Sequence, residues 1–203
     1  GIEIPGQYAP DGASDMALAA KTMLEEHIKG KNICILLPKN PRLQTTNRMG
    51  QTLAQVLSED GVWAQKLFLE NGLALAVPSE TTDDIYPLLL TAETIAREGK
   101  IGLWDTDMPN PETIQPNPYI TQVVTGEIVS VSTIKNNIYL NFGANWKEDF
   151  TVMIPSNMRS TLSRAGLNPA QLQGKTIRVR GNVESYYGPL IKIRYVDQIE
   201  ILN

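Results

Sequence analysis

The 203-residue sequence contains one cysteine, Cys34, and one histidine, His27. A single cysteine excludes an intramolecular disulfide and a multi-thiolate zinc site. A single histidine excludes a histidine-rich metal centre and makes a Ser–His–Asp triad improbable. Most zinc enzymes and most nucleophilic hydrolases are therefore excluded by the supply of side chains alone.

Long hydrophobic runs are also missing. A membrane-spanning helix needs about 18 apolar residues, whereas a run such as 33–37 has only the length of a strand. The chain does not start with methionine, and it lacks a basic segment followed by an apolar one, which is the pattern of a secretion signal. We expect no membrane span, and the sequence leaves the compartment undetermined.

The net charge of −4 argues against a protein that binds polyanions through bulk charge. Residues 1–108 hold 9 basic and 15 acidic side chains, and residues 109–203 hold 9 and 7. A nucleic-acid contact would therefore need a local basic face, and only the second half could supply it.

A proline-rich segment divides the chain, with four prolines between residues 109 and 118. Proline removes a backbone donor and biases the preceding residue toward extended geometry, which is typical of a linker. We expect a first domain over 1–104, a linker over 105–119 and a second domain over 120–203.

The first half predicts three helices and two strands. Ser14 can cap a helix that ends near Lys29, and a second helix covers 62–70. The third, over 83–99, has apolar residues at helical spacing behind Asp83 and Asp84. Strands are expected over 31–37, which places Cys34 in the core, and over 51–57.

The second half predicts mostly strands. Three strands, a helix and two further strands are expected, followed by an edge strand, over 123–132, 138–142, 150–154, 156–165, 176–185, 190–195 and 198–202. This is the order of elements in an oligonucleotide/oligosaccharide-binding (OB-fold) barrel. The fold class is therefore α+β.

Alternation in the last strands suggests a binding face. Apolar residues point one way, and Arg178, Arg180, Lys192 and Arg194 would point outward, near Lys175, Tyr186 and Tyr187. Cations beside stacking aromatics suit single-stranded nucleic acid. The alternative is a solvated outer face of the barrel.

Several segments of the first half together resemble the thermonuclease (staphylococcal-nuclease-like) family. They are Gly1-Ile-Glu-Ile-Pro5, Asn47-Arg-Met-Gly-Gln-Thr-Leu53, Asp60-Gly-Val-Trp-Ala-Gln65, Asn71-Gly-Leu-Ala74 and Ala92-Glu-Thr-Ile-Ala-Arg-Glu-Gly-Lys-Ile-Gly-Leu-Trp104. The second half is similar to an OB-like domain that follows the nuclease domain in some bacterial members. The resemblance implies a partial nuclease-like domain whose first three strands would precede Gly1, and it favours a periplasmic or secreted location.

The resemblance implies a calcium-dependent phosphodiesterase, in which a glutamate activates water and two arginines stabilise the transition state. The family's metal-binding carboxylate corresponds to Glu3, but its catalytic glutamate falls at Gly6 and one arginine at Gln51. The other arginine and the first metal carboxylate would lie upstream of Gly1. We therefore expect no catalytic residue, and calcium only if an upstream carboxylate joins Glu3.

Three functions remain open. The first is a catalytically degenerate protein that binds nucleic acid or acts as an interaction module. The second is a calcium-dependent nuclease whose catalytic residues lie upstream or are replaced, for example by Asp11 or Asp15. The third is a structural or envelope-associated protein. Because the first barrel would lack strands, we also expect its open sheet edge to be paired within the chain or covered by a second copy or a protein partner.

Overall fold

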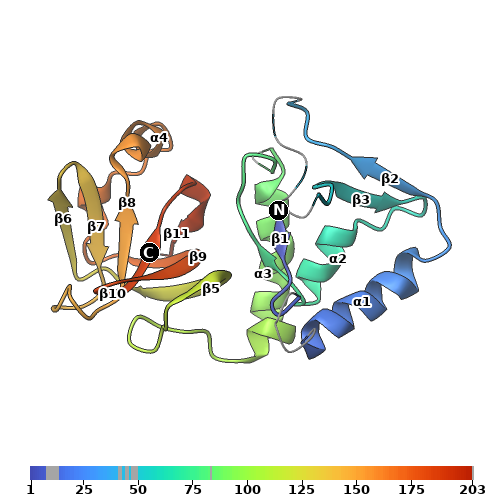
Figure 1. Cartoon of the computed structure of the whole chain (residues 1–203), viewed down its shortest axis with the longest axis horizontal. Coiled ribbons are helices and arrows are strands. Elements are labelled where there is room, and N and C mark those ends of the chain that lie inside the picture. Colours follow the sequence, from blue (N-terminus) through green and yellow to red (C-terminus); the bar gives the residue numbers. More distant parts are fainter. Residues whose placement is uncertain (8–13, 41–42, 44–45, 47–49, 83, 203) are drawn as a thin grey trace. The chain divides into compact units, whose positions relative to one another are not determined.

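The computed structural model describes residues 1–7, 14–40, 43, 46, 50–82 and 84–202. The chain divides into two compact units, Gly1–Thr106 and Asp107–Asn203 (Figure 1). Among the described residues, no helix combines the length and the apolar character that a membrane crossing requires.

Within the described residues, the first unit contains three α-helices and two small antiparallel sheets. Its elements are β1 (Ile2–Glu3), α1 (Asp15–Ile28), β2 (Ile33–Leu36), β3 (Gln55–Ser58), α2 (Ala64–Glu70), β4 (Leu75–Ala76), α3 (Tyr86–Gly99) and a 3-10 helix at Gly102–Asp105. Strand β1 pairs with β4, and β2 pairs with β3. The three helices and two longer strands predicted here are confirmed, with shifted ends.

The start of α3 differs from the prediction. The helix begins at Tyr86 rather than at residue 83, with Pro87 in its first turn, where the missing N–H is tolerated. Asp84 precedes the helix, and Asp83 lies outside the described residues. The start of α1 agrees with the prediction, because the Ser14 side chain accepts a hydrogen bond from the Ala17 N–H at 3.2 Å.

The core of the first unit lies between the helices and β4. Ala20 of α1, Phe68 and Leu69 of α2, and Leu89 and Ala92 of α3 pack together. Two residues of the predicted apolar face of α3, Leu88 and Ile95, are exposed instead. The buried face of α3 consists of Tyr86, Leu89, Ala92, Glu93 and Ala96, so it includes one carboxylate, that of Glu93.

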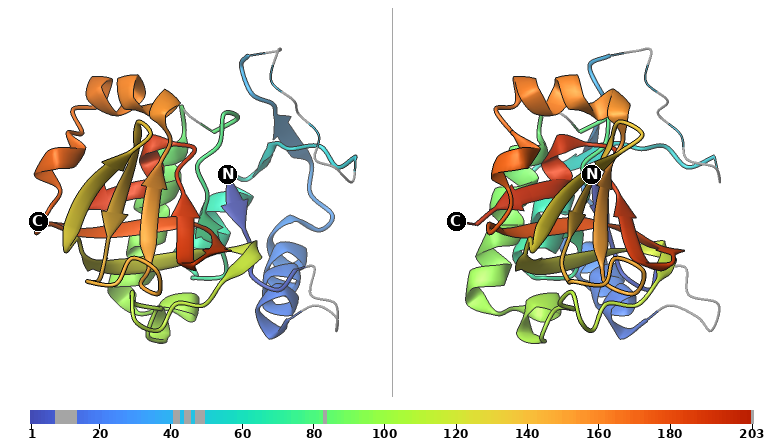
Figure 2. Two further views of the ribbon diagram at one scale, coloured as in Figure 1. Left: turned by 60° about the vertical axis from the view of Figure 1, so that its left-hand side comes forward. Right: turned by 90° about the vertical axis from the view of Figure 1, so that its left-hand side faces the viewer.

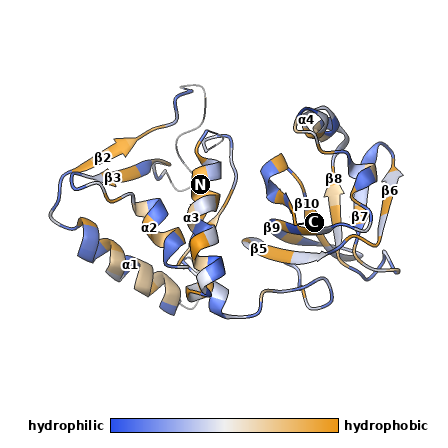
Figure 3. Cartoon of the chain, turned by 180° about the vertical axis from the view of Figure 1, so that it is seen from behind, coloured by the Kyte–Doolittle hydropathy of each residue, from blue (hydrophilic) through white to orange (hydrophobic). Residues whose placement is uncertain are grey.

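Strand β2 is apolar but exposed along its whole length (Figure 3). The prediction that Cys34 is a core residue is wrong: its side chain is exposed. Within the described residues β2 has one partner strand, β3, and no second layer covers it. Among the described residues, no strand pairs with the second edge of β2, so the expected pairing within the chain is not found there, and coverage by another chain stays a prediction.

The second unit is built on one seven-stranded sheet. Its strands and its α-helix are β5 (Asn117–Glu127), β6 (Ser130–Ile134), β7 (Asn137–Asn141), β8 (Thr151–Ile154), α4 (Arg159–Arg164), β9 (Thr176–Tyr186), β10 (Gly188–Lys192) and β11 (Ile199–Ile201). Short 3-10 helices lie at Ser156–Met158, Pro169–Gln171 and Val196–Gln198. The strand order is β11-β9-β10-β8-β7-β6, and β5 also pairs with β9. Strands β8 and β10 run parallel, whereas the other pairs are antiparallel. The strands curve around an apolar core, and α4 lies at one end (Figure 2).

The strand predicted over 123–132 is in fact two strands. Ile128 hydrogen-bonds to Lys175 and Gly174, on the β9 side, whereas the N–H of Val129 donates to Asn141 O of β7 at 2.9 Å. The chain thus changes partner between two consecutive residues. This change connects β9 to β7 through one continuous stretch of chain.

The proline-rich segment over 105–119 is not a free linker along its length. Asn110 accepts hydrogen bonds from the N–H groups of Glu112 and Thr113, which forms a turn. Ile114 follows this turn and is buried in the core of the second unit. Residues 117–119 already belong to β5. The prolines limit the backbone, but the apolar Ile114 fixes this segment to the sheet.

Candidate functional site

Glu3, the expected metal ligand, lies in β1 opposite Leu75 and is partly buried. Calcium takes six to eight oxygen ligands, so one carboxylate is insufficient. Across the residues that the structure describes, no three His, Cys, Asp or Glu side chains are grouped so that they could hold a metal ion. These residues therefore do not fit a calcium site.

Gly6, where the family's catalytic glutamate would fall, has a backbone that disfavours any side chain. Its φ of +75° is a left-handed conformation, and a Cβ built there would lie 2.5 Å from Ser14 Cβ. Ser14 is held in this place because its hydroxyl donates to Pro5 O at 2.8 Å and caps α1. A glutamate at this position would require the start of α1 to move.

Gln51, where the family has an arginine, is exposed and follows Gly50, whose φ is +75°. Its amide is neutral and cannot replace a guanidinium near a phosphate. The adjacent Asn47, Arg48 and Met49 lie outside the described residues, as does Asp11. Asp15, the other candidate substitute base, is the first residue of α1 and is exposed.

The prediction that Arg178 and Arg180 are exposed to solvent is wrong, although both alternate with the core residues Ile177 and Val179 along the strand. Arg180 is 1% exposed and its Nη2 lies 2.6 Å from Glu200 Oε1, while Arg178 Nη1 lies 3.1 Å from Glu200 Oε2. Strand β11 causes this arrangement, because its pairing with β9 places Glu200 opposite Arg178. These two cations are bound to a carboxylate of their own chain.

The other predicted contact residues are exposed, but Lys175 lies far from the two tyrosines. Lys175 directly precedes β9, and Tyr186 is the last residue of this eleven-residue strand. At about 3.3 Å per residue the two positions are on the order of 30 Å apart. Lys192 and Arg194 are exposed on and just after β10. The structure therefore does not gather the predicted residues into one basic face.

It does gather three exposed aromatic side chains, from the loop before β8 and from the turn between β9 and β10. The rings of Tyr186 and Tyr187 have centroids 5.2 Å apart, and those of Tyr187 and Trp146 are 5.6 Å apart. We call these three residues the aromatic cluster; they are 60%, 69% and 55% exposed, respectively. A tryptophan inside the polar loop 143–149 is the sequence signal for this cluster.

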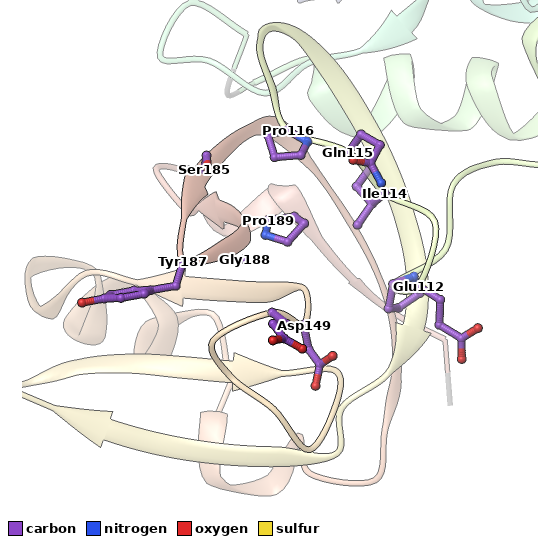
Figure 4. A pocket seen from close by; sticks show the side chains of 11 residues that line it. Glu112, Ile114, Gln115, Pro116, Asp149, Ser185, Tyr187, Gly188 and Pro189 are labelled. Carbon is purple, nitrogen blue, oxygen red and sulfur yellow. The ribbon is translucent and has the colours of Figure 1, made fainter.

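The aromatic cluster borders a pocket of about 510 Å³ in the second unit (Figure 4). In the close-up, Tyr187 lies at one side and Ile114, Gln115 and Pro116 at the other, with Asp149 and Pro189 between them. Glu112 and Glu148 also line the pocket, so that three carboxylates are present. No lysine or arginine is among the lining residues.

In the first unit, two of the segments that carry the family resemblance meet at a pair of glycines. Leu103 directly follows Gly102, and its N–H donates to Gly72 O at 2.9 Å. Both glycines have positive φ, 63° and 59°. Asn71-Gly72 and Gly102-Leu103 thus form one backbone contact that closes the end of α2 against the end of α3.

Comparison with known families gives a direct result for this unit. Residues 1–106 match the family described as staphylococcal nuclease homologue, which is just over half of the chain. No curated protein matches the chain. The match covers the predicted nuclease-like segment, including the Gly72–Gly102 contact, and it confirms the family expected from the sequence. The chain belongs to the staphylococcal nuclease homologue family.

Proposed function

We propose that this chain is a catalytically degenerate member of its family and acts as a binding module. The observation that carries the proposal is Gly6: the expected position of the catalytic glutamate is a left-handed glycine pressed against Ser14. Loss of a general base lowers the rate by about 10²–10⁴. The neutral Gln51 adds the loss of a transition-state stabiliser, about 2.7–4 kcal/mol. Both losses affect the same chemical step.

We also infer that the second unit is an OB-type barrel that follows the nuclease-like domain over 1–104. Part of the predicted linker 105–119 would then belong to the barrel expected over 120–203, because Ile114 lies in its core and β5 begins at Asn117. Strands β5 and β6 would be the two halves of one bent first strand. The circuit β6-β7-β8-β10-β9-β5 and the parallel β8–β10 pair support this interpretation. Helix α4 lies between β8 and β9, as expected for this fold.

The chain is expected not to hydrolyse single-stranded or duplex DNA in millimolar calcium. The assay measures release of a fluorescent fragment from a labelled oligonucleotide, with and without a chelator. The matched variant is Glu3→Gln, which removes the one retained metal carboxylate. Calcium-dependent cleavage that disappears in this variant would instead support the alternative, a calcium-dependent phosphodiesterase with replaced catalytic residues.

Single-stranded nucleic acid is a second candidate ligand, favoured by the exposed rings of Tyr186 and Tyr187. Three predicted cations, Lys175, Lys192 and Arg194, form no ion pair within the described part of the chain. At about −0.7 per neutralised phosphate, the log–log salt slope is expected to be no steeper than about −2.

The measurement is fluorescence anisotropy of a labelled oligonucleotide at several salt concentrations. The test variant is Lys192→Gln with Arg194→Gln. Charge reversal of Arg178 is unsuitable, because it would face Glu200. A steep slope that the double variant leaves unchanged would show that binding uses other residues.

A further inference from the structure

We propose that the pocket beside the aromatic cluster binds a basic peptide segment, with lysine or arginine side chains placed between the carboxylates and the aromatic rings. The inference rests on the proposed function, because it names the partner of a binding module. It does not use the predicted basic face. The pocket and the cluster come from three separate stretches of the second unit: 111–116, 146–149 and 185–189.

The charges around the pocket select a cationic ligand. Glu112, Glu148 and Asp149 line it, and Glu184, which directly precedes the lining residue Ser185, is also exposed. None of these four carboxylates forms an ion pair with another described residue. The neighbouring positive charge is that of Lys147, whose Nζ lies 5.7 Å from the Trp146 ring centroid. This excess of negative charge repels a phosphate backbone and attracts a basic side chain.

The aromatic cluster supplies a second kind of contact for the same ligand. A guanidinium or ammonium group is attracted to the face of a tryptophan or tyrosine within about 6 Å. Lys147 already uses Trp146 in this way, so the geometry is accessible to a cation. Tyr186 and Tyr187 offer further exposed ring surface. A peptide with two or more basic residues could therefore use the pocket and the rings together.

Backbone hydrogen bonds fold the loop of the site and close backbone contacts hold it against the neighbouring turn. The Asn145 N–H donates to Asp149 Oδ2 at 2.6 Å, and the N–H groups of Glu148 and Asp149 donate to Asn145 O, so the loop folds on itself. A Cβ built on Gly188 would lie 2.6 Å from Glu148 O, which shows how closely the loop and the turn approach. Tyr187 is held at a φ of 63°, which a bulky side chain rarely adopts. Pre-organisation lowers the entropic loss on binding.

A peptide fits these observations better than the other ligand classes. A single small amine would leave most of the three rings uncovered. A nucleic acid would bring phosphates toward Glu148 and Asp149. The apolar wall formed by Ile114, Pro116 and Pro189 matches the aliphatic stem of lysine or arginine, which packs along apolar surface while its charged end stays at the carboxylates.

The test titrates the full chain into a labelled peptide of alternating glycine and arginine and follows fluorescence anisotropy. Binding is expected at low ionic strength and should weaken as salt is added. Glu148→Gln and Tyr187→Asn should each lower the affinity about three- to fivefold, and the double variant about tenfold. Asparagine is chosen at 187 because it adopts the left-handed conformation more readily than tyrosine, so thermal stability should not fall.

The control is Glu127→Gln, which removes an exposed carboxylate opposite Thr176, at the far end of β9; it should bind the peptide like the parent. The inference is overturned by a lack of peptide binding at low salt or by variants that bind as well as the parent. It is also overturned if the Tyr187→Asn variant loses binding of a thymidine oligonucleotide or an oligosaccharide but still binds the peptide. The nuclease assay gives an independent result. Calcium-dependent cleavage of DNA would overturn the proposal that the chain is catalytically degenerate, but it would not change the result of the peptide titration.

Discussion

Replacement of Gly72 by alanine is expected to lower the free energy of unfolding of the first unit by more than about 3 kcal/mol. The added Cβ would overlap Ile101 O and would lie 2.8 Å from Ile101 C, and both are backbone atoms that cannot rotate away. The residue would also keep a φ of 63°. Overpacking and left-handed strain therefore act together at this position.

The chain offers a matched control for the strain alone. Gly30 has a φ of +79° with nothing within 4 Å of a built Cβ. Gly30→Ala should therefore lose only about 1–2 kcal/mol. Denaturant unfolding followed by far-UV circular dichroism measures both, because the long helices α1 and α3 lie in the first unit. Equal losses in the two variants would show that the Gly72–Gly102 contact contributes nothing.

This contact also explains what the sequence could reveal about the first unit. Asn71-Gly72 and Gly102-Leu103 each appear in the printed sequence as local signals, the first as a helix stop. Their resemblance to a known family could be detected without knowing why they occur together. The structure supplies the reason: two backbones approach so closely that neither glycine accepts a side chain. Signals of this kind can be recognised in the sequence because each depends on a few neighbouring residues.

The failures have a common physical origin in contacts between distant strands. Alternation correctly predicted that Ile177 and Val179 face the core, and both are fully buried. It could not predict the environment of Arg178 and Arg180, because the register of β11 brings Glu200 to them. A carboxylate twenty residues away leaves no trace in the periodicity of β9.

The same limit applies to the pocket and to Cys34. Trp146 and Tyr187 meet because β8 and β10 run parallel, which brings the loop before β8 close to the turn before β10. No local pattern encodes that pairing. An apolar run such as 33–37 normally indicates a buried strand, but burial needs a second layer, and none of the described residues covers β2. Periodicity predicts which side chains share a face, whereas what covers that face depends on the whole chain.

The second large effect is expected at Glu93, a charge hidden within the apolar face of α3. Its side chain is fully buried; Oε2 accepts the N–H of Ala76 at 2.7 Å, and Oε1 lies 3.5 Å from Arg97 Nη1. The Arg97 guanidinium also donates to Thr94 Oγ1 at 2.8 Å and lies 5.7 Å from the Trp104 ring centroid. Glu93 therefore joins β4 to α3, and through Arg97 it connects to the 3-10 helix.

Glu93→Ala is expected to lower the free energy of unfolding by about 3–5 kcal/mol, because it removes one partner of a largely desolvated ion pair. Glu98→Ala, on the exposed side of the same helix, should change it by less than about 0.5 kcal/mol. The double variant Glu93→Leu with Arg97→Met should be more stable than Glu93→Ala, since no unpaired charge remains. If Glu93→Ala loses no more stability than Glu98→Ala, the buried carboxylate does not hold β4 against α3. If the double variant is the least stable of the three, the packing around the pair matters more than its charges.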